Sequence, residues 1–210
     1  RVSRRQRQMC IRDRLLAMLC ILVLILMIIW KQNRIIPESL RSIIFRRIEK
    51  EHNDKEKFYT SYNSSTFSDI IDAYYEEIID EIMKDLGMFK RSTYYRNLWV
   101  QMYNSETDTH TAHSHFGGTE IISFTHIINC SEQKCFYFLG KDDRKIYPDQ
   151  RVGDILAWPS WLMHGVDKVK DPSINRLVVS GNIALKDYYD NDASFVSRDH
   201  GNGHITWDIV

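Results

Sequence analysis

The clearest periodic pattern in the chain lies in residues 66–86, where apolar side chains recur at helical spacing. Thr66 and Asp69 have the spacing of a capping box, and Gly87 follows the last apolar position. The pattern predicts an amphipathic helix whose apolar face is buried against the rest of the domain. Its broad apolar face consists of Ile70, Ile71, Tyr74, Tyr75, Ile78, Ile79, Ile82, Met83 and Leu86.

A second segment, residues 35–57, has helical character but a weak apolar stripe and many charges, so we interpret it as a connecting helix. Three later segments are rich in β-branched and aromatic residues, which is typical of buried strands. They cover residues 119–128, 153–160 and 176–185. Helices followed by a series of strands predict a mainly β domain.

The first 34 residues differ from the rest and are interpreted as a basic and hydrophobic leader. Six arginines surround one acidic residue in the first 14 positions, and 16 apolar residues follow at positions 15–30. This arrangement resembles a signal anchor, although it is shorter than the ~20 residues that span a bilayer comfortably. Residues 3–14 also resemble translated sequencing adapter, so we expect the first 14 residues to be artefactual. A chain that begins near Phe58 is then expected to stay soluble and to bind metal.

The charge balance changes when the leader is set aside. The whole chain has 28 basic and 28 acidic residues, but eight of the basic residues and only one acidic residue lie in the first 34 positions. The remaining domain is therefore acidic by seven charges and has no general nucleic-acid footprint. We expect a cytoplasmic protein of phage or bacterial origin, attached to a membrane only if residues 15–30 are a genuine anchor.

Three histidines supply the candidate chemistry. His113 and His115 are one residue apart, and His164 follows a Trp-Pro step after a strand-like run. Alternate residues of a strand project to one face, so the first two imidazoles can share an ion, with His164 added from a distant strand. Neutral imidazole suits zinc, iron, copper and nickel. Three protein ligands indicate a site with coordination positions left open for chemistry.

Nearby polar residues leave alternatives open. His110 is interpreted as a loop residue or as a support for one of the ligands, and the pattern leaves undecided whether His126 points into the barrel. Asp108 and Glu120 are the only carboxylates near enough in sequence to replace a histidine as ligand.

Cysteine and glycine-rich segments carry weaker signals. Cys130 and Cys135 bracket an expected hairpin turn and are predicted to be free thiols. Residues 200–204 contain two histidines, but their glycines and their place in the chain favour a flexible tail.

Three separated motifs resemble those of the Fe(II)- and 2-oxoglutarate-dependent oxygenases, in the prolyl-hydroxylase-like group common in phage and marine bacterial sequences. Residues 99–103 are similar to the strand before the histidine pair. Residues 153–164 are similar to the Gly-Asp-hydrophobic-aromatic-Pro-Ser segment that ends in the distal histidine, and residues 176–182 to the Arg-x-x-x-Ser-x-Asn strand.

This resemblance implies a double-stranded β-helix, or jelly roll, with supporting N-terminal helices. The oxygenase domain would cover residues 58–210, with a jelly-roll core at residues 97–185 and a polar tail at residues 186–210.

The resemblance also implies roles for particular residues. His113, His115 and His164 would hold Fe(II), and Arg176 would pair with the distal carboxylate of 2-oxoglutarate. The implied reaction is hydroxylation of a C–H bond of a protein, nucleobase or metabolite by dioxygen, with succinate and carbon dioxide as co-products and ascorbate as an optional further cofactor. Most of the superfamily has a carboxylate where His115 stands, and a neutral ligand leaves the site more positive and open to another metal.

Two rival hypotheses remain at this stage. A cupin-like enzyme would use the same three histidines without 2-oxoglutarate, as a dioxygenase or isomerase, and Arg176 would then have no co-substrate role. A non-catalytic jelly-roll module would bind a sugar or a peptide.

Overall fold

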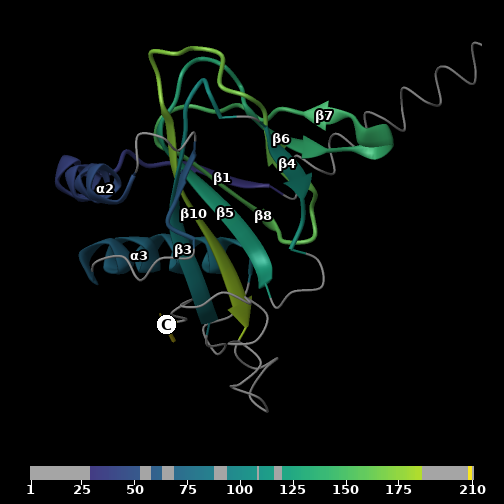
Figure 1. Cartoon of the computed structure of the whole chain (residues 1–210). Helices are drawn as coiled ribbons and strands as arrows, with labels where there is room; N and C mark the ends of the chain where they lie inside the picture. Colours follow the sequence, from purple (N-terminus) through teal and green to yellow (C-terminus); the bar gives the residue numbers. More distant parts are fainter. Residues whose placement is uncertain are drawn as a thin grey trace, which may run out of the picture.

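Two antiparallel sheets form the body of the protein in the computed structural model, which describes residues 29–52, 58–62, 69–87, 94–107, 109–115, 120–185 and 208–209 (Figure 1). The larger sheet has the order β1 (Trp30–Asn33), β8 (Asp154–Pro159), β5 (Glu120–Asn129), β10 (Arg176–Leu185), β3 (Tyr94–Tyr103) and β11 (Asp208–Ile209), with β2 (Phe58–Thr60) paired to β3. The smaller sheet has the order β4 (His110–His113), β9 (His164–Val166), β6 (Phe136–Leu139) and β7 (Lys145–Ile146). A short 3-10 helix, η1 (Lys141–Asp143), lies between β6 and β7. The predicted mainly β class is confirmed.

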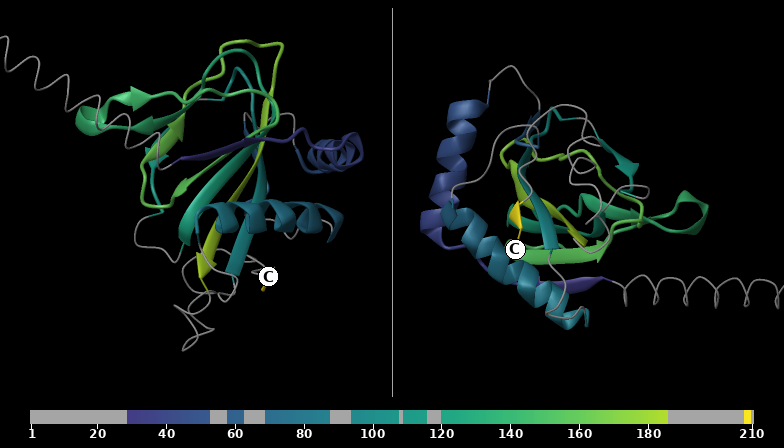
Figure 2. Two further views of the ribbon diagram at one scale, coloured as in Figure 1. Left: turned by 180° about the vertical axis from the view of Figure 1, so that it is seen from behind. Right: turned by 90° about the horizontal axis from the view of Figure 1, so that it is seen from below.

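Strand alternation gives the larger sheet two different faces. On β10 the odd-numbered positions Leu177, Val179 and Ile183 belong to an apolar cluster with the helices. The even-numbered positions from Arg176 to Asn182 line a cavity on the other face. Figure 2 shows that both helices lie on the side of this sheet that faces away from the smaller sheet. The polar residues of the strands therefore face the space between the sheets.

Helix α3 (Asp69–Asp85) covers the outer face of the larger sheet, as its pattern predicts. Two members of the predicted apolar face are exposed, Ile70 to 61% and Leu86 to 38%, because they lie at the margins of the buried stripe. Gly87 ends the segment with a φ of 71°, a conformation that glycine adopts without strain. The proposed cap at Thr66 lies outside the described residues. The buried side chains of the helix are Ile71, Tyr75, Ile78, Ile79, Ile82 and Met83.

Helix α2 (Glu38–Glu51) is part of the core rather than a simple connection. Its buried residues, Leu40, Ile44 and Ile48, are four positions apart and form one narrow stripe. Charged residues surround this stripe, which is why the sequence pattern was weak. The helix nevertheless packs into the same apolar cluster as α3.

Strand β1 lies within residues 1–34, the stretch that the sequence analysis interprets as a leader. Residues Trp30–Asn33 pair with β8, with Trp30 opposite Ala157 and Asn33 opposite Asp154. Helix α2 also precedes Phe58, and it buries Leu40, Ile44 and Ile48. Burial of one large apolar side chain stabilises the fold by about 1.5–3 kcal/mol, so the contribution of α2 is comparable with the whole free energy of unfolding of a domain. The packing therefore argues against the expectation that a chain beginning near Phe58 folds.

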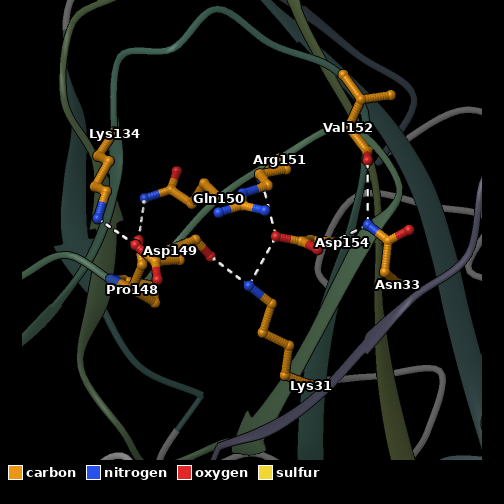
Figure 3. Close-up of polar contacts among 9 residues, drawn as sticks. All are labelled: Lys31, Asn33, Lys134, Pro148, Asp149, Gln150, Arg151, Val152 and Asp154. Atoms are coloured by element: carbon orange, nitrogen blue, oxygen red, sulfur yellow. Dashed lines mark hydrogen bonds and ion pairs between the residues drawn. The ribbon is translucent and has the colours of Figure 1, made fainter.

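The carboxylate of Asp154 binds β1 to the sheet through an ion pair and hydrogen bonds (Figure 3). It is 3% exposed, and it accepts from Lys31 Nζ at 2.8 Å, from Asn33 Nδ2 at 2.9 Å and from the backbone nitrogen of Arg151 at 2.9 Å. Lys31 also donates to the carbonyl oxygen of Asp149 at 3.0 Å. These bonds tie the edge strand to the loop before β8.

Replacing Asp154 with asparagine should destabilise the fold by about 1–3 kcal/mol, because Lys31 and the Arg151 amide lose a charged acceptor in a buried place. Urea unfolding monitored by circular dichroism measures the loss. Asp149→Asn is the matched control, since that side chain pairs with Lys134 at the surface and its loss should leave the midpoint nearly unchanged. Equal midpoints for wild type and Asp154→Asn would show that the Asp154 network does not stabilise β1.

Two further expectations fall largely outside the described residues. The apolar run is described only at its end, and among the described helices none has the length and apolarity needed to cross a membrane. Of the predicted polar tail, the structure describes β11, which pairs with β3. The motif at residues 200–204 lies outside the described residues.

Candidate metal centre

The three predicted histidines lie together at the junction of β4, β9 and the end of β8. His113 and His164 stand opposite each other in the antiparallel β4–β9 pair. His115 lies two residues beyond the end of β4, and its backbone nitrogen donates to the carbonyl oxygen of Ser160 at 2.8 Å. The predicted strand therefore ends before the second histidine, because the chain there turns toward β8.

The imidazole nitrogens of the three rings are close enough for one ion. One candidate nitrogen from each of His113, His115 and His164 lies within 4.8 Å of the others. The ring centroids of His113 and His164 are 4.5 Å apart, and those of His115 lie 5.4 Å and 5.5 Å from these two rings. The structure thus brings together all three residues of the predicted ligand set.

Backbone carbonyls orient two of the rings. Nδ1 of His113 lies 3.0 Å from the carbonyl oxygen of Thr111, and Nδ1 of His164 lies 2.9 Å from that of Leu162. A carbonyl oxygen only accepts, so Nδ1 carries the hydrogen in both residues and the lone pair of Nε2 is free for a metal. The two rings are held in the tautomer that a metal ligand needs.

Burial also keeps His164 neutral. It lowers the pKa of His164 to about 3, and the nearby His113 lowers it further in the same direction. An imidazole with this pKa is uncharged throughout the neutral range, which is the form that binds metal.

Arg176 begins β10 and has the environment of an anion-binding side chain. The residue is 3% exposed, and its second terminal nitrogen has no hydrogen-bond partner among the described residues. Its guanidinium carbon lies 5.5 Å from the ring centroid of Tyr103, its register partner on β3. Arginine keeps its charge when buried, so this unpaired donor favours a bound anion.

One cavity of about 330 Å³ connects Arg176 with the histidines. Aromatic side chains supply much of its wall, as is typical of small-molecule sites. Residues that line this cavity include Tyr62, Trp99, Gln101, Tyr103, Phe136, Trp158, Val178 and Ser180.

Tyr103 is a site residue that the sequence reasoning did not single out. Burial raises its pKa to values at which the phenol stays protonated, and its hydroxyl lies 3.0 Å from Nδ1 of His110. The available signal was its position at the end of the strand that precedes the histidine pair. The residue of β10 that Tyr103 faces depends on the register of the two strands, and the sequence does not show this register.

His110 lies beside His113, one of the three residues that could share an ion. It begins β4, and its ring stacks on His113 with centroids 4.8 Å apart. Burial and then His113 lower its pKa to about 4. Among the described residues it is not in the group of three that could share an ion.

His126 points away from the cavity and into the contact with α3. It is fully buried, with Nδ1 at 2.9 Å from the Tyr75 hydroxyl and Nε2 at 2.8 Å from the carbonyl oxygen of Arg34. It therefore has a structural role, which answers the question that the strand pattern left undecided.

His126 should make the metal-free protein sensitive to mild acid. Burial lowers its folded-state pKa to about 4, below the ~6.5 of an unfolded histidine, so only the unfolded state takes up a proton between these values. Stability is full above pH ~6.5 and falls, by about 3 kcal/mol in total, as the pH drops to about 4. Urea titrations across this range should show a shallower pH dependence for His126→Leu than for wild type, and identical slopes would refute the assignment.

Glu120 is buried but is not among the described residues that could share an ion, and Asp108 lies outside the described residues. Cys130 and Cys135 are free thiols, as predicted.

Comparison with known proteins identifies the fold. No family model and no curated protein sequence matches the chain. Among solved structures, a Pseudomonas putida prolyl-4-hydroxylase superposes with a TM-score of 0.56 at 14% identity, over 75% of this chain and 92% of that one. The viral collagen prolyl hydroxylase of Paramecium Bursaria Chlorella virus-1, in its 2-oxoglutarate complex, gives 0.51 at 10% identity over 74% and 95% of the two chains.

A third similar structure is the epimerase SnoN in complex with Fe3+, alpha ketoglutarate and nogalamycin RO, with a TM-score of 0.57 at 11% identity over 75% of this chain and 78% of that one. The chain therefore has the jelly-roll fold of the 2-oxoglutarate- and Fe(II)-dependent oxygenases, which confirms the fold implied by the sequence motifs.

Proposed function

We propose that the protein is an Fe(II)- and 2-oxoglutarate-dependent dioxygenase that hydroxylates a C–H bond of its substrate. The observation that carries the proposal is the pairing of two features in one cavity. Three histidines there can share an ion, and a buried arginine there has a donor with no hydrogen-bond partner in the part of the chain that the structure describes. The fold shared with enzymes of this chemistry supports the same conclusion.

The donor set fits a ferrous ion. His113, His115 and His164 would hold it through neutral imidazoles, and three protein ligands leave positions for a chelating co-substrate and for dioxygen. When bound, iron and 2-oxoglutarate supply the oxidising power, with decarboxylation of 2-oxoglutarate to succinate and hydroxylation of the substrate by dioxygen.

The side chains of the cavity bind and orient the co-substrate. Arg176 would hold the distal carboxylate of 2-oxoglutarate through two parallel hydrogen bonds, which a planar guanidinium makes with a carboxylate. The ring of Tyr103 lies beside this guanidinium, with its centroid 5.5 Å from the guanidinium carbon. The cavity also has an apolar surface, which would exclude water from the ion pair between Arg176 and the carboxylate. This surface includes Phe136, Trp158 and Val178.

The test is turnover of 2-oxoglutarate in the presence of Fe(II), dioxygen and ascorbate. We expect slow release of succinate even without the substrate, and none from a His113→Ala variant that keeps its circular dichroism spectrum. Metal binding without any consumption or binding of 2-oxoglutarate would favour a cupin-like enzyme instead.

A further inference from the structure

A chain of buried hydrogen bonds lies behind His115, the ligand that stands where most of the superfamily has a carboxylate. Ser123 Oγ donates to Asn182 Oδ1 at 2.8 Å and lies 3.0 Å from Ser160 Oγ. The three side chains are 2%, 0% and 1% exposed. The carbonyl of Ser160 binds the backbone of His115, and the Asn182 amide reaches its ring, so the chain contacts both parts of this residue.

Strand register explains how these residues meet. Asn182 on β10 stands directly opposite Ser123 on β5. Ser160 immediately follows β8, the neighbour of β5 on the other side. The polar chain therefore crosses three adjacent strands on the inner face and ends at the candidate metal centre.

The contact between Asn182 and His115 differs from those of the other two ligands. Nδ1 of His115 lies 3.4 Å from Nδ2 of Asn182, whereas Nδ1 of His113 and of His164 face carbonyl oxygens. A neutral imidazole has a hydrogen on only one of its two nitrogens. If His115 binds metal through Nε2, the hydrogen is on Nδ1 and needs an acceptor there.

A half-turn of the Asn182 amide supplies this acceptor without loss of bonds. Oδ1 then faces Nδ1 of His115, and Nδ2 donates to Ser123 Oγ. A hydroxyl both accepts and donates, so Ser123 can take this bond and pass its own hydrogen to Ser160.

We propose that Asn182 is the positioning residue for His115, with Oδ1 as the acceptor of the Nδ1 hydrogen when metal is bound. Ser123 and Ser160 hold the amide in this orientation. All three histidine ligands then donate Nδ1–H to an amide-type oxygen. The inference rests on the proposed metal site. It gives a role to Asn182, the last residue of the Arg-x-x-x-Ser-x-Asn motif.

Titration of the metal-free protein with Co(II) alone, followed by its visible absorption bands, tests the inference. Asn182→Leu should weaken Co(II) binding about 10- to 100-fold, the usual cost of losing a hydrogen-bond partner of a metal ligand. Asn182→Asp should bind at least as tightly as wild type, because a carboxylate accepts the same hydrogen and reduces the positive charge of the site. Asn129→Leu is the matched control and should leave Co(II) binding unchanged, since the Asn129 amide donates to the carbonyl oxygen of Asn175 rather than to His115.

The outcomes separate this inference from the proposed function. Equal Co(II) affinity and equal spectra in wild type and Asn182→Leu would overturn the role of Asn182 while leaving the metal site intact. Weak binding by both Asn182→Leu and Asn182→Asp, with unchanged thermal unfolding of the metal-free proteins, would also overturn it. A wild-type protein that does not bind Co(II) would remove the metal site itself.

Discussion

Replacing His164 with alanine should lower Fe(II) affinity by more than 100-fold and abolish turnover of 2-oxoglutarate. Loss of a direct ligand must exceed the roughly 10- to 100-fold cost of losing a residue that only supports one. His164 is also the most constrained of the three, buried on β9 with its Nδ1 bonded to the Leu162 carbonyl. Anaerobic equilibrium dialysis followed by iron analysis measures the affinity.

The control for this variant is His52→Ala, because His52 caps α2 and is not among the described residues that could share an ion. It should bind Fe(II) as wild type does. Unchanged affinity in His164→Ala would place the ion elsewhere and would leave the cluster of three imidazoles without a function.

Arg176→Lys should weaken 2-oxoglutarate binding by about 1.5–3 kcal/mol, or roughly 10- to 150-fold. Lysine keeps the charge but loses the planar pair of donors, and its ammonium is costly to bury without full hydrogen bonding. Fe(II) binding should stay nearly unchanged, because Arg176 is not one of the ligands. Calorimetry with 2-oxoglutarate under anaerobic conditions, with Fe(II) present, measures the difference.

Arg144→Lys, an exposed substitution at the end of η1, is the control for charge-preserving replacement. The same 2-oxoglutarate affinity in wild type and Arg176→Ala would remove Arg176 from the co-substrate site. The cupin-like hypothesis would then be preferred.

The sequence predicted the histidine set because its signal is local. Two of the proposed ligands are close neighbours, and the third ends a motif that contains an apolar strand and a Trp-Pro-Ser turn. The pleat argument was incomplete in one respect, since β4 ends at His113 and His115 is placed by its bond to Ser160.

Features that depend on register could not be predicted in this way. Tyr103 meets Arg176, and Asn182 meets Ser123, because β10 pairs with β3 and β5 at one particular register. Each residue alone is an ordinary strand position, and sequence alternation shows its face but not its neighbour.

The pairing of Trp30–Asn33 with β8 could not be predicted for a related reason. The four residues Trp30–Asn33 form an edge strand too short to produce a pattern of its own. The strand begins at the last residue of a long apolar run, which dominates the local composition. Their place in the sheet depends on the buried carboxylate of Asp154, which is 121 positions away from Asn33.

Anaerobic titration of the protein with Fe(II) and 2-oxoglutarate tests the central claim most directly. The account predicts a visible metal-to-ligand charge-transfer band that saturates at one Fe(II) and one 2-oxoglutarate per chain. The band should be absent in His164→Ala, and in Arg176→Lys it should require a higher 2-oxoglutarate concentration. A wild-type protein that binds Fe(II) but develops no such band at saturating 2-oxoglutarate would contradict the assignment of this cavity to a 2-oxoglutarate-dependent oxygenase.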